Sequence, residues 1–445
     1  MKENVSSPGR YGFRLPGEAV LLILVLFLAG CTNFWGAPAA TPTFGAAETT
    51  AATLAPTITI SPESGVTPSP AGGMTLTLWL PPEFDPYRSE PAAEALLARL
   101  QLFITENPGT RINVRLKAQD GPGGLLEALA AAAPVAPQVM PAVVAMRASD
   151  VALAADQGLL VPLDGLSAAV DETDWYAYAH DLADFEGRAY GLPFSGDAVV
   201  MVYRPAQVDI PPQTWQELLL WGRPVLFPAA DEQAWLTFLL YQGYGGVLTN
   251  DHADPILQAA PLAQVLDIYA RGLQQGSFST NAMQTGSDAE VWQAFLEQRS
   301  NVVITWSSNY LKTMPADAMI ASLPSLEKRW ITLADGWVWC ITDPDPARRE
   351  LSIRLAEHLT ASNFMADWSQ KAGLLPARPS ALAAWPNQTL RAVLGPIAIS
   401  AQEIPGHAVT QNAGPVLQSA VLQILRQEID PFPAAQSAVE ALSGP

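Results

Sequence analysis

The feature that most constrains the fold is a strand, a helix and a second strand that follow one another from residue 74. Leu76, Leu78 and Leu80 alternate with two threonines and a tryptophan, which is the period-two pattern of a strand. Apolar residues recur at helical spacing in 91–107, and 111–116 alternates again. Parallel strands need such a crossover to pair. The sequence therefore predicts a βαβ unit and an α/β fold.

The same alternation of strand and helix patterns continues toward the C-terminus. Strands are expected at 141–146, 198–203, 301–306 and 336–341, and helices from 125 and at 151–160, 215–220, 234–242, 261–274, 289–298, 347–360, 415–427 and 434–442. The glycine-rich loop at 120–124 comes directly before a helix, so its amides could face a ligand or form a plain turn.

The N-terminus has the pattern of a secretion signal. Three basic residues precede the apolar run 19–30, which is too short to span a bilayer as a stable helix. The run ends in Leu-Ala-Gly-Cys at 28–31, which resembles a bacterial lipobox. We therefore expect residues 1–30 to be a lipoprotein signal peptide and Cys31 to be lipidated, with an ordinary signal peptide or a short anchor that happens to contain a cysteine as the alternative.

Residues 31–73 have the composition of a tether. The segment after Cys31 is rich in Ala, Thr, Pro, Ser and Gly, contains no Lys or Arg, and has no apolar periodicity. A flexible coil of this length spans on the order of 35 Å. The folded part is expected at 74–435, held clear of the membrane surface.

Charge and composition exclude several classes of function. The net charge of −19 becomes −20 for a chain that starts at Cys31, because the first thirty residues carry three basic and two acidic side chains. Such an acidic protein repels phosphate backbones, so no nucleic-acid partner is expected. The four histidines have no metal-ligand spacing, and neither a metal nor a cofactor is expected. Cys340, inside an apolar strand, is expected to be a small buried hydrophobic residue.

No catalytic motif is present. The chain has no G-x-S-x-G elbow, P-loop or H-E-x-x-H sequence. Asp181 with Asp184, and Asp343 with Asp345, are carboxylate pairs of the kind any acidic protein contains. We expect no enzyme, and an extracytoplasmic glycoside hydrolase is a weaker alternative.

Several segments, in this order, resemble the family 1 extracellular solute-binding proteins, the group that contains maltose-type and other sugar-binding components of ABC importers. These segments are GLLVPLDGL at 158–166, YGLPFSGDAVVMVYR at 190–204, TW at 214–215, EVWQAFLEQRSNVVITWSSNY at 290–310, LADGWVWCITDPDPARRE at 333–350 and KAGLLPAR at 371–378. The chain departs from the family pattern at Gln298 and Arg299, where the family often has a glycine, and at Ala142, where it often has an acid.

The resemblance implies a two-lobed, periplasmic-binding-protein-like fold of type II with a ligand cleft between the lobes. It implies a first lobe of about 74–192 and 325–342, and a second lobe of about 195–322 and 346–435. It also implies a monomer, tethered outside the cytoplasm through Cys31, that closes over a saccharide and delivers it to ABC permease subunits. A ligand-sensing or scaffold lipoprotein with the same clamp is the alternative.

Candidate ligand-binding residues lie where expected strands end in loops, which is where open α/β sheets bind ligands. Sugar rings present apolar faces to aromatic rings and hydroxyls to carboxylates and amides. The candidates are Trp79, Glu83, Ser195, Asp197, Trp306, Asn309, Tyr310, Asp335 and Trp337. By contrast, Trp215, Trp221, Trp292 and Trp339 are expected to pack in the core or to cap a helix. Abundant tryptophan favours sugars over a glycerol phosphate or a polyamine.

Overall fold

A computed structural model describes residues 58–60, 73–343 and 345–444. The expected signal peptide, Cys31 and most of the expected tether lie outside these residues. Across the part that is described, no helix has the length and apolar character needed to cross a membrane.

The predicted βαβ unit is present. β2 (Met74–Leu80) runs parallel to β3 (Thr110–Leu116), and α1 (Pro91–Glu106) connects them. Leu76 and Leu78 of β2 are fully buried beneath α1, whose Leu100 is also fully buried. Apolar residues alternate along β2 and recur at helical spacing along α1, so the apolar side chains of both elements point into one shared core.

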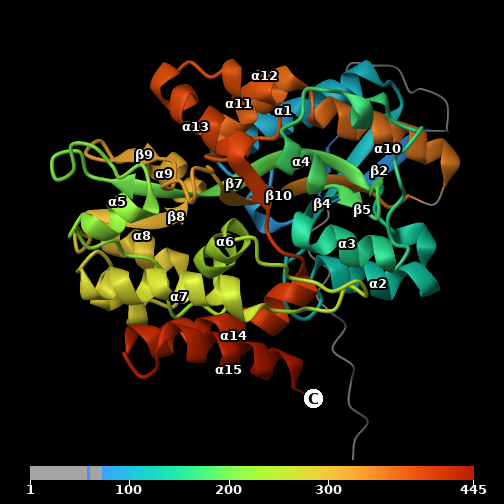
Figure 1. The fold of residues 1–445 in the computed structure, drawn as a ribbon. Helices are drawn as coiled ribbons and strands as arrows, with labels where there is room; N and C mark the ends of the chain where they lie inside the picture. Colours follow the sequence, from blue (N-terminus) through green and yellow to red (C-terminus); the bar gives the residue numbers. More distant parts are fainter. Residues whose placement is uncertain (1–57, 61–72, 344, 445) are drawn as a thin grey trace, which may run out of the picture. The chain divides into compact units, whose positions relative to one another are not determined.

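The sheet grows from this unit toward the centre of the fold (Figure 1). β4 (Val143–Arg147) pairs parallel with β2, and β10 (Thr332–Ile341) pairs antiparallel with β4. The long strand β7 (Gly191–Tyr203) then pairs antiparallel with β10. The result is a mixed sheet, and the prediction of an α/β fold is confirmed.

β7 belongs to two groups of strands. Its N-terminal part pairs with β10, whereas Val199–Tyr203 pairs with β8 (Val302–Trp306) and, over its last residues, with β9 (Met319–Ala321). Short strands β11 (Leu375–Pro376) and β12 (Ala401–Glu403) pair with β7 and β10. β7 and β10 therefore carry the chain between two lobes.

Helices cover both lobes. The helices besides α1 are α2 (Leu125–Val135), α3 (Ala148–Asp156), α4 (Ala177–Asp181), α5 (Trp215–Leu220), α6 (Trp235–Gly243), α7 (Ala259–Gln274), α8 (Asp288–Leu296), α9 (Ser307–Thr313), α10 (Pro346–Leu359), α11 (Ser362–Ala372), α12 (Pro379–Ala383), α13 (Gln388–Ser400), α14 (His407–Leu425) and α15 (Pro431–Ser443). Figure 1 shows α7, α14 and α15 together on the side of the second lobe, away from α1 and α10. The remaining elements are the small hairpin β5 (Asp184–Phe185) with β6 (Arg188–Ala189) and four single turns of 3₁₀ helix.

The packing of α10 and α11 differs from the expected division, which placed 346–435 in the second lobe. Leu355 and Leu359 of α10 and Trp368 of α11 share a core with Leu76 and the other apolar residues of β2. α10 contacts β2 and β10, and α11 contacts α1. These two helices therefore pack with the first-lobe strands.

Several other elements were not predicted or begin earlier than expected. β1 (Ile58–Ile60), inside the expected tether, pairs antiparallel with β3 at the edge of the sheet. α13 was not predicted and contains Pro396, and α14 begins eight residues before Pro415, where its start was expected. Proline usually ends a helix, yet each of these two helices continues through one.

Candidate functional site

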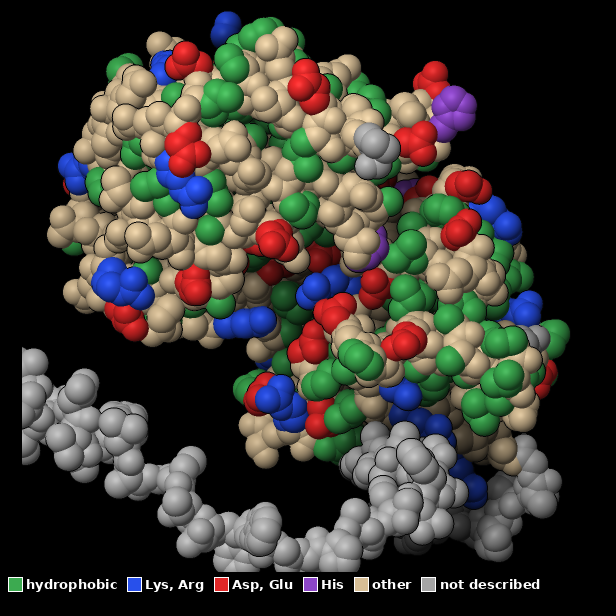
Figure 2. Space-filling model, turned by 90° about the horizontal axis from the view of Figure 1, so that it is seen from below, with side chains coloured by type: hydrophobic (Ala, Val, Ile, Leu, Met, Phe, Trp, Pro, Cys, Tyr) green, Lys and Arg blue, Asp and Glu red, His purple; other side chains and the backbone are tan. Residues whose placement is uncertain are grey.

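A cavity of about 1000 Å³ lies between the two lobes. First-lobe residues line it from β4, β10, the start of α1 and the 3₁₀ turn Pro82–Phe84. Second-lobe residues line it from α6, β8, α9 and α14. Figure 2 shows a groove between two masses, with acidic and basic side chains on its walls.

The first-lobe wall is aromatic. Trp337 of β10 packs edge-on against Phe84, with ring centroids 4.8 Å apart, and Phe84 also contacts Trp368 at 5.5 Å. All three line the cavity. Aromatic rings fixed in this way by neighbouring rings offer a rigid apolar surface at little entropic cost.

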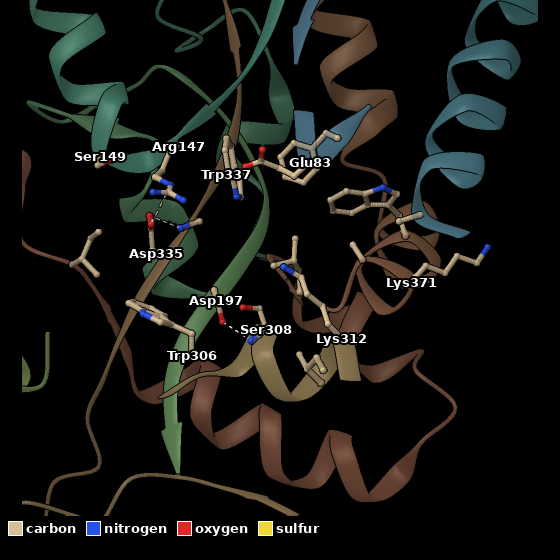
Figure 3. Close-up of a pocket in the computed structure, with 18 of the residues that line it drawn as sticks. Glu83, Arg147, Ser149, Asp197, Trp306, Ser308, Lys312, Asp335, Trp337 and Lys371 are labelled. Carbon is tan, nitrogen blue, oxygen red and sulfur yellow. Dashed lines mark hydrogen bonds and ion pairs between the residues drawn. The ribbon is translucent and has the colours of Figure 1, made fainter. Parts of the chain in front are cut away.

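The second-lobe wall has its own aromatic pair. Trp306, at the end of β8, lies edge-on to Trp235 at the start of α6, with centroids 6.2 Å apart. Ser308 and Lys312 of α9 continue this wall, and Lys312 forms no ion pair with any described residue. In Figure 3, Trp306 and Trp337 lie on either side of Asp335.

The floor of the cavity carries an ion pair. Arg147, the last residue of β4, lies 3.6 Å from Asp335 of β10, and its guanidinium stands 5.5 Å from the centre of the Trp337 ring. Burial raises the pKa of Asp335 to about 6, although the Arg147 charge acts in the opposite direction. Burial also raises the pKa of the neighbouring Asp150 to about 6. The floor thus offers both a donor and acceptors to polar ligand groups.

Carboxylates also lie on two strands that pair with β10. Asp197 of β7 lies directly opposite Asp335 in the ladder, and Glu403 of β12 is level with the residue before Asp335. Asp197 accepts hydrogen bonds from the Ser307 hydroxyl at 2.6 Å and the Ser308 N–H at 2.8 Å. Burial, and then the charges of Asp181, Asp335 and Asp184, raise the pKa of Glu403 to about 8.

Five of the nine candidate residues line the cavity: Glu83, Asp197, Trp306, Asp335 and Trp337. They come from four separate parts of the chain, so the structure brings together residues that are far apart in sequence. No contact between these residues and a ligand is observed, and their role stays a prediction.

The other four candidates do not line this cavity. Trp79 is almost fully buried, with Lys117 over its ring at 4.7 Å, and Ser195 is fully buried within the ladder between β7 and β10. Tyr310 is buried and its hydroxyl donates to the Ala318 carbonyl. Asn309 donates to Asp288 and to the Thr305 hydroxyl. Strand pleating and helical rotation turn these side chains away from the space their neighbours face.

Several cavity residues were not foreseen: Arg147, Asp150, Trp235, Lys312 and Trp368. Arg147 follows a strand and could have been found by the strand-end rule that selected Asp335. Trp235 and Trp368 sit in helical patterns that also suit core residues, and Trp368 is in fact 3% exposed. Of the four tryptophans expected in the core or at a helix cap, Trp215, Trp292 and Trp339 are buried, whereas Trp221 is half-buried and caps the C-terminus of α5.

In the described ranges, no group of three or more His, Cys, Asp or Glu residues is arranged to hold a metal ion. Cys340 is fully buried, and burial raises the pKa of its thiol. Its position in β10 agrees with the expected small hydrophobic role.

The two lobes, the strands that connect them and the cavity between them define a solute-binding protein. A family model described as bacterial extracellular solute-binding protein matches residues 98–392, about two thirds of the chain. The chain therefore belongs to the bacterial extracellular solute-binding proteins.

Solved structures agree on the fold. The sugar-binding protein MalE of Xanthomonas citri superposes with a TM-score of 0.69 at 18% identity, covering 83% of this chain and 98% of that chain. The cyclic alpha-maltosyl-1,6-maltose binding protein of Arthrobacter globiformis gives 0.68 at 17% identity, with 83% and 98% covered. The maltose-binding periplasmic protein MalE of Listeria monocytogenes, solved with maltose, gives 0.66 at 15%, with 83% and 97% covered. The expected two-lobed periplasmic-binding-protein-like fold is confirmed.

Proposed function

We propose that this protein captures a saccharide in the cavity between its lobes and delivers it, chemically unchanged, to an ABC permease. The observation that carries this proposal is the pair of aromatic walls, Trp337 with Phe84 on one lobe and Trp235 with Trp306 on the other. Rings on opposing walls suit the two apolar faces of a pyranose, and the names of the structural neighbours point to maltose-type sugars.

The polar lining supports a neutral polyhydroxyl ligand over a phosphate. Asp197, Asp150 and Asp335 all line the cavity, where they outnumber Lys312, the lining cation without an ion pair among the described residues, and the guanidinium of Arg147 is already paired with Asp335. An incoming phosphate would meet these carboxylates as like charges, whereas sugar hydroxyls can donate to them. A glycerol phosphate is therefore the weaker candidate.

Closure of the two lobes supplies the coupling to transport. A ligand that contacts both walls stabilises the closed state by its differential affinity for that state, and a permease that recognises the closed form then receives only loaded protein. Lipidation at Cys31 would keep the protein at the membrane beside its permease. We keep the sensory role as an alternative that uses the same clamp.

A thermal-shift screen of the full chain tests the proposal. A ligand that binds only the native state raises the melting temperature of the protein. At a free ligand concentration of 100 times the Kd, binding adds about 2.7 kcal/mol to the free energy of unfolding. We expect saturable shifts with maltose, maltotriose or other neutral saccharides, and none with glycerol 3-phosphate or spermidine. Shifts confined to phosphates or polyamines would contradict the proposal.

A further inference from the structure

Trp306 stands on a turn that is held from behind by one buried carboxylate. Asp288, the first residue of α8, accepts a hydrogen bond from the Thr305 hydroxyl at 2.7 Å. The Asn309 amide also donates to it, and so does the backbone N–H of Trp306. Three residues of the turn from β8 into α9 are therefore fixed by the same side chain.

The position of Asp288 separates it from the ligand cavity. It does not line the cavity between the lobes but a space of about 30 Å³ behind Trp306, which Trp235 also lines. Asn309 links the arrangement further, because its amide donates to the Thr305 hydroxyl at 2.8 Å as well. Asp288 contacts the residues on both sides of the wall tryptophan without reaching the cavity.

The geometry points to Asp288 as a positioning residue for Trp306. Asp288 thereby sets ligand affinity without touching the ligand. The effect of Asp288 on ligand affinity rests on the proposed function, whereas its effect on the position of Trp306 does not. An aromatic wall binds a ring well only when its plane is held in place, and a charged acceptor that binds three donors restrains the turn more strongly than a neutral one.

Protonation of Asp288 should make the position of the turn depend on pH. Burial raises the pKa of Asp288 to about 6, the field of Asp197 on β7 adds to the rise, and the hydrogen bonds from Thr305, Asn309 and Trp306 oppose it. The partners from β8 and α9 are uncharged, and Glu290 on α8 is exposed and bonded to the Gly286 N–H. Below its pKa the side chain loses acceptor capacity, so the turn should loosen as the pH falls through about 6.

Fluorine NMR of the full chain containing 5-fluorotryptophan tests the inference without a ligand. The Trp306 signal is the one missing from Trp306→Phe. We expect this signal to shift with pH with a midpoint near 6, and Asp288→Asn to displace it and abolish the titration. Glu290→Gln, in the same helical turn, should leave both unchanged. A Trp306 signal that titrates identically in Asp288→Asn would overturn the inference.

Two further variants cover the case in which Asp288→Asn does not fold. Asn309→Ala removes a donor to the carboxylate and should raise the midpoint, whereas Asp197→Asn removes a like charge and should lower it. Unchanged midpoints in both would also overturn the inference.

Calorimetry with maltose and maltotriose measures the consequence for binding. The Kd should rise roughly fivefold or more in Asp288→Asn and stay unchanged in Glu290→Gln. An equal Kd in Asp288→Asn contradicts the effect on affinity. If neither sugar binds the wild type, the proposed function fails for these sugars, and the Trp306 signal still decides whether Asp288 positions the ring.

Discussion

Individual carboxylates determine much of the charge and protonation in and beside this cleft. Asp335 and Asp197 face each other across the ladder between β10 and β7, where like charges oppose folding. Glu403 adds a third acid on β12, and its pKa of about 8 leaves it protonated at neutral pH. At neutral pH the folded protein therefore holds a proton on Glu403 that the unfolded chain would release.

Glu403→Gln should change how stability depends on pH. The folded pKa of about 8 lies above the ordinary 4.5. The folded state therefore keeps a proton that the unfolded chain has lost, and the free energy of unfolding falls as the pH rises from about 4.5 through 8. Glutamine stays neutral, so the variant should be more stable than the wild type by on the order of 2 kcal/mol at pH 9.

Urea unfolding at pH 5, 7 and 9 measures this difference. The exposed Glu428 provides the control, because Glu428→Gln should follow the wild-type pH dependence. Parallel curves for Glu403→Gln and the wild type would show that Glu403 is ionised in the folded protein.

Among the elements, β7 and β10 matter most because they carry the chain between the lobes. Gly196 of β7 pairs with Gly336 of β10, next to the two opposed aspartates. A side chain at Gly196 would overlap the hydroxyl of Tyr178 on α4, and one at Gly336 would overlap Leu182. The crossing is thus packed so closely that both strands need glycine at the same level.

Gly196→Ala should lower the free energy of unfolding by about 1–3 kcal/mol, because a methyl group there forces Tyr178 or the strand to move. Gly286→Ala serves as the control, since its nearest neighbours are 3.9 Å from the added carbon, and it should change stability by no more than about 0.5 kcal/mol. Chemical denaturation of both variants gives the comparison. Equal stabilities would show that the crossing tolerates a larger residue.

Sequence periodicity predicted the regular elements, but it failed for segments whose conformation depends on pairing with a distant strand. β2, β3, β8 and α5 follow directly from alternation and helical spacing. The N-terminal part of β7 contains Gly191, Pro193 and Gly196, which weaken a strand pattern, and it is a strand because β10 pairs with it through a register shift. The local sequence of β7 gives no information about its pairing with β10.

The same limit applies to the site. Of the candidates that line the cavity, Trp306 ends β8 as the strand-end rule requires, whereas Asp335 and Trp337 lie within β10. Asn309 was selected by the same rule, but its amide turns to Asp288 on another helix. Which way such a side chain turns depends on a contact between segments that no periodicity shows.

The described residues form two lobes around a cavity, and we propose that lipidation of Cys31 tethers the whole molecule to the membrane. Cys31→Ser should remove the acyl attachment and release the protein from the membrane fraction, since a single short apolar segment does not hold it there. Fractionation of cells that express the two forms, followed by immunoblotting, measures the distribution. Equal retention of both forms at the membrane would contradict lipid anchoring through Cys31.

If both lobes bind one saccharide, isothermal titration calorimetry of the full chain with maltose and maltotriose should detect that binding. We predict one saturable site, with Trp337→Ala and Trp306→Ala each raising the Kd by at least about tenfold, or ~1.4 kcal/mol. Trp330→Ala removes an exposed tryptophan outside the cavity and should bind like the wild type. Saccharide binding that survives unchanged in both cavity variants would show that the two aromatic walls do not hold the sugar.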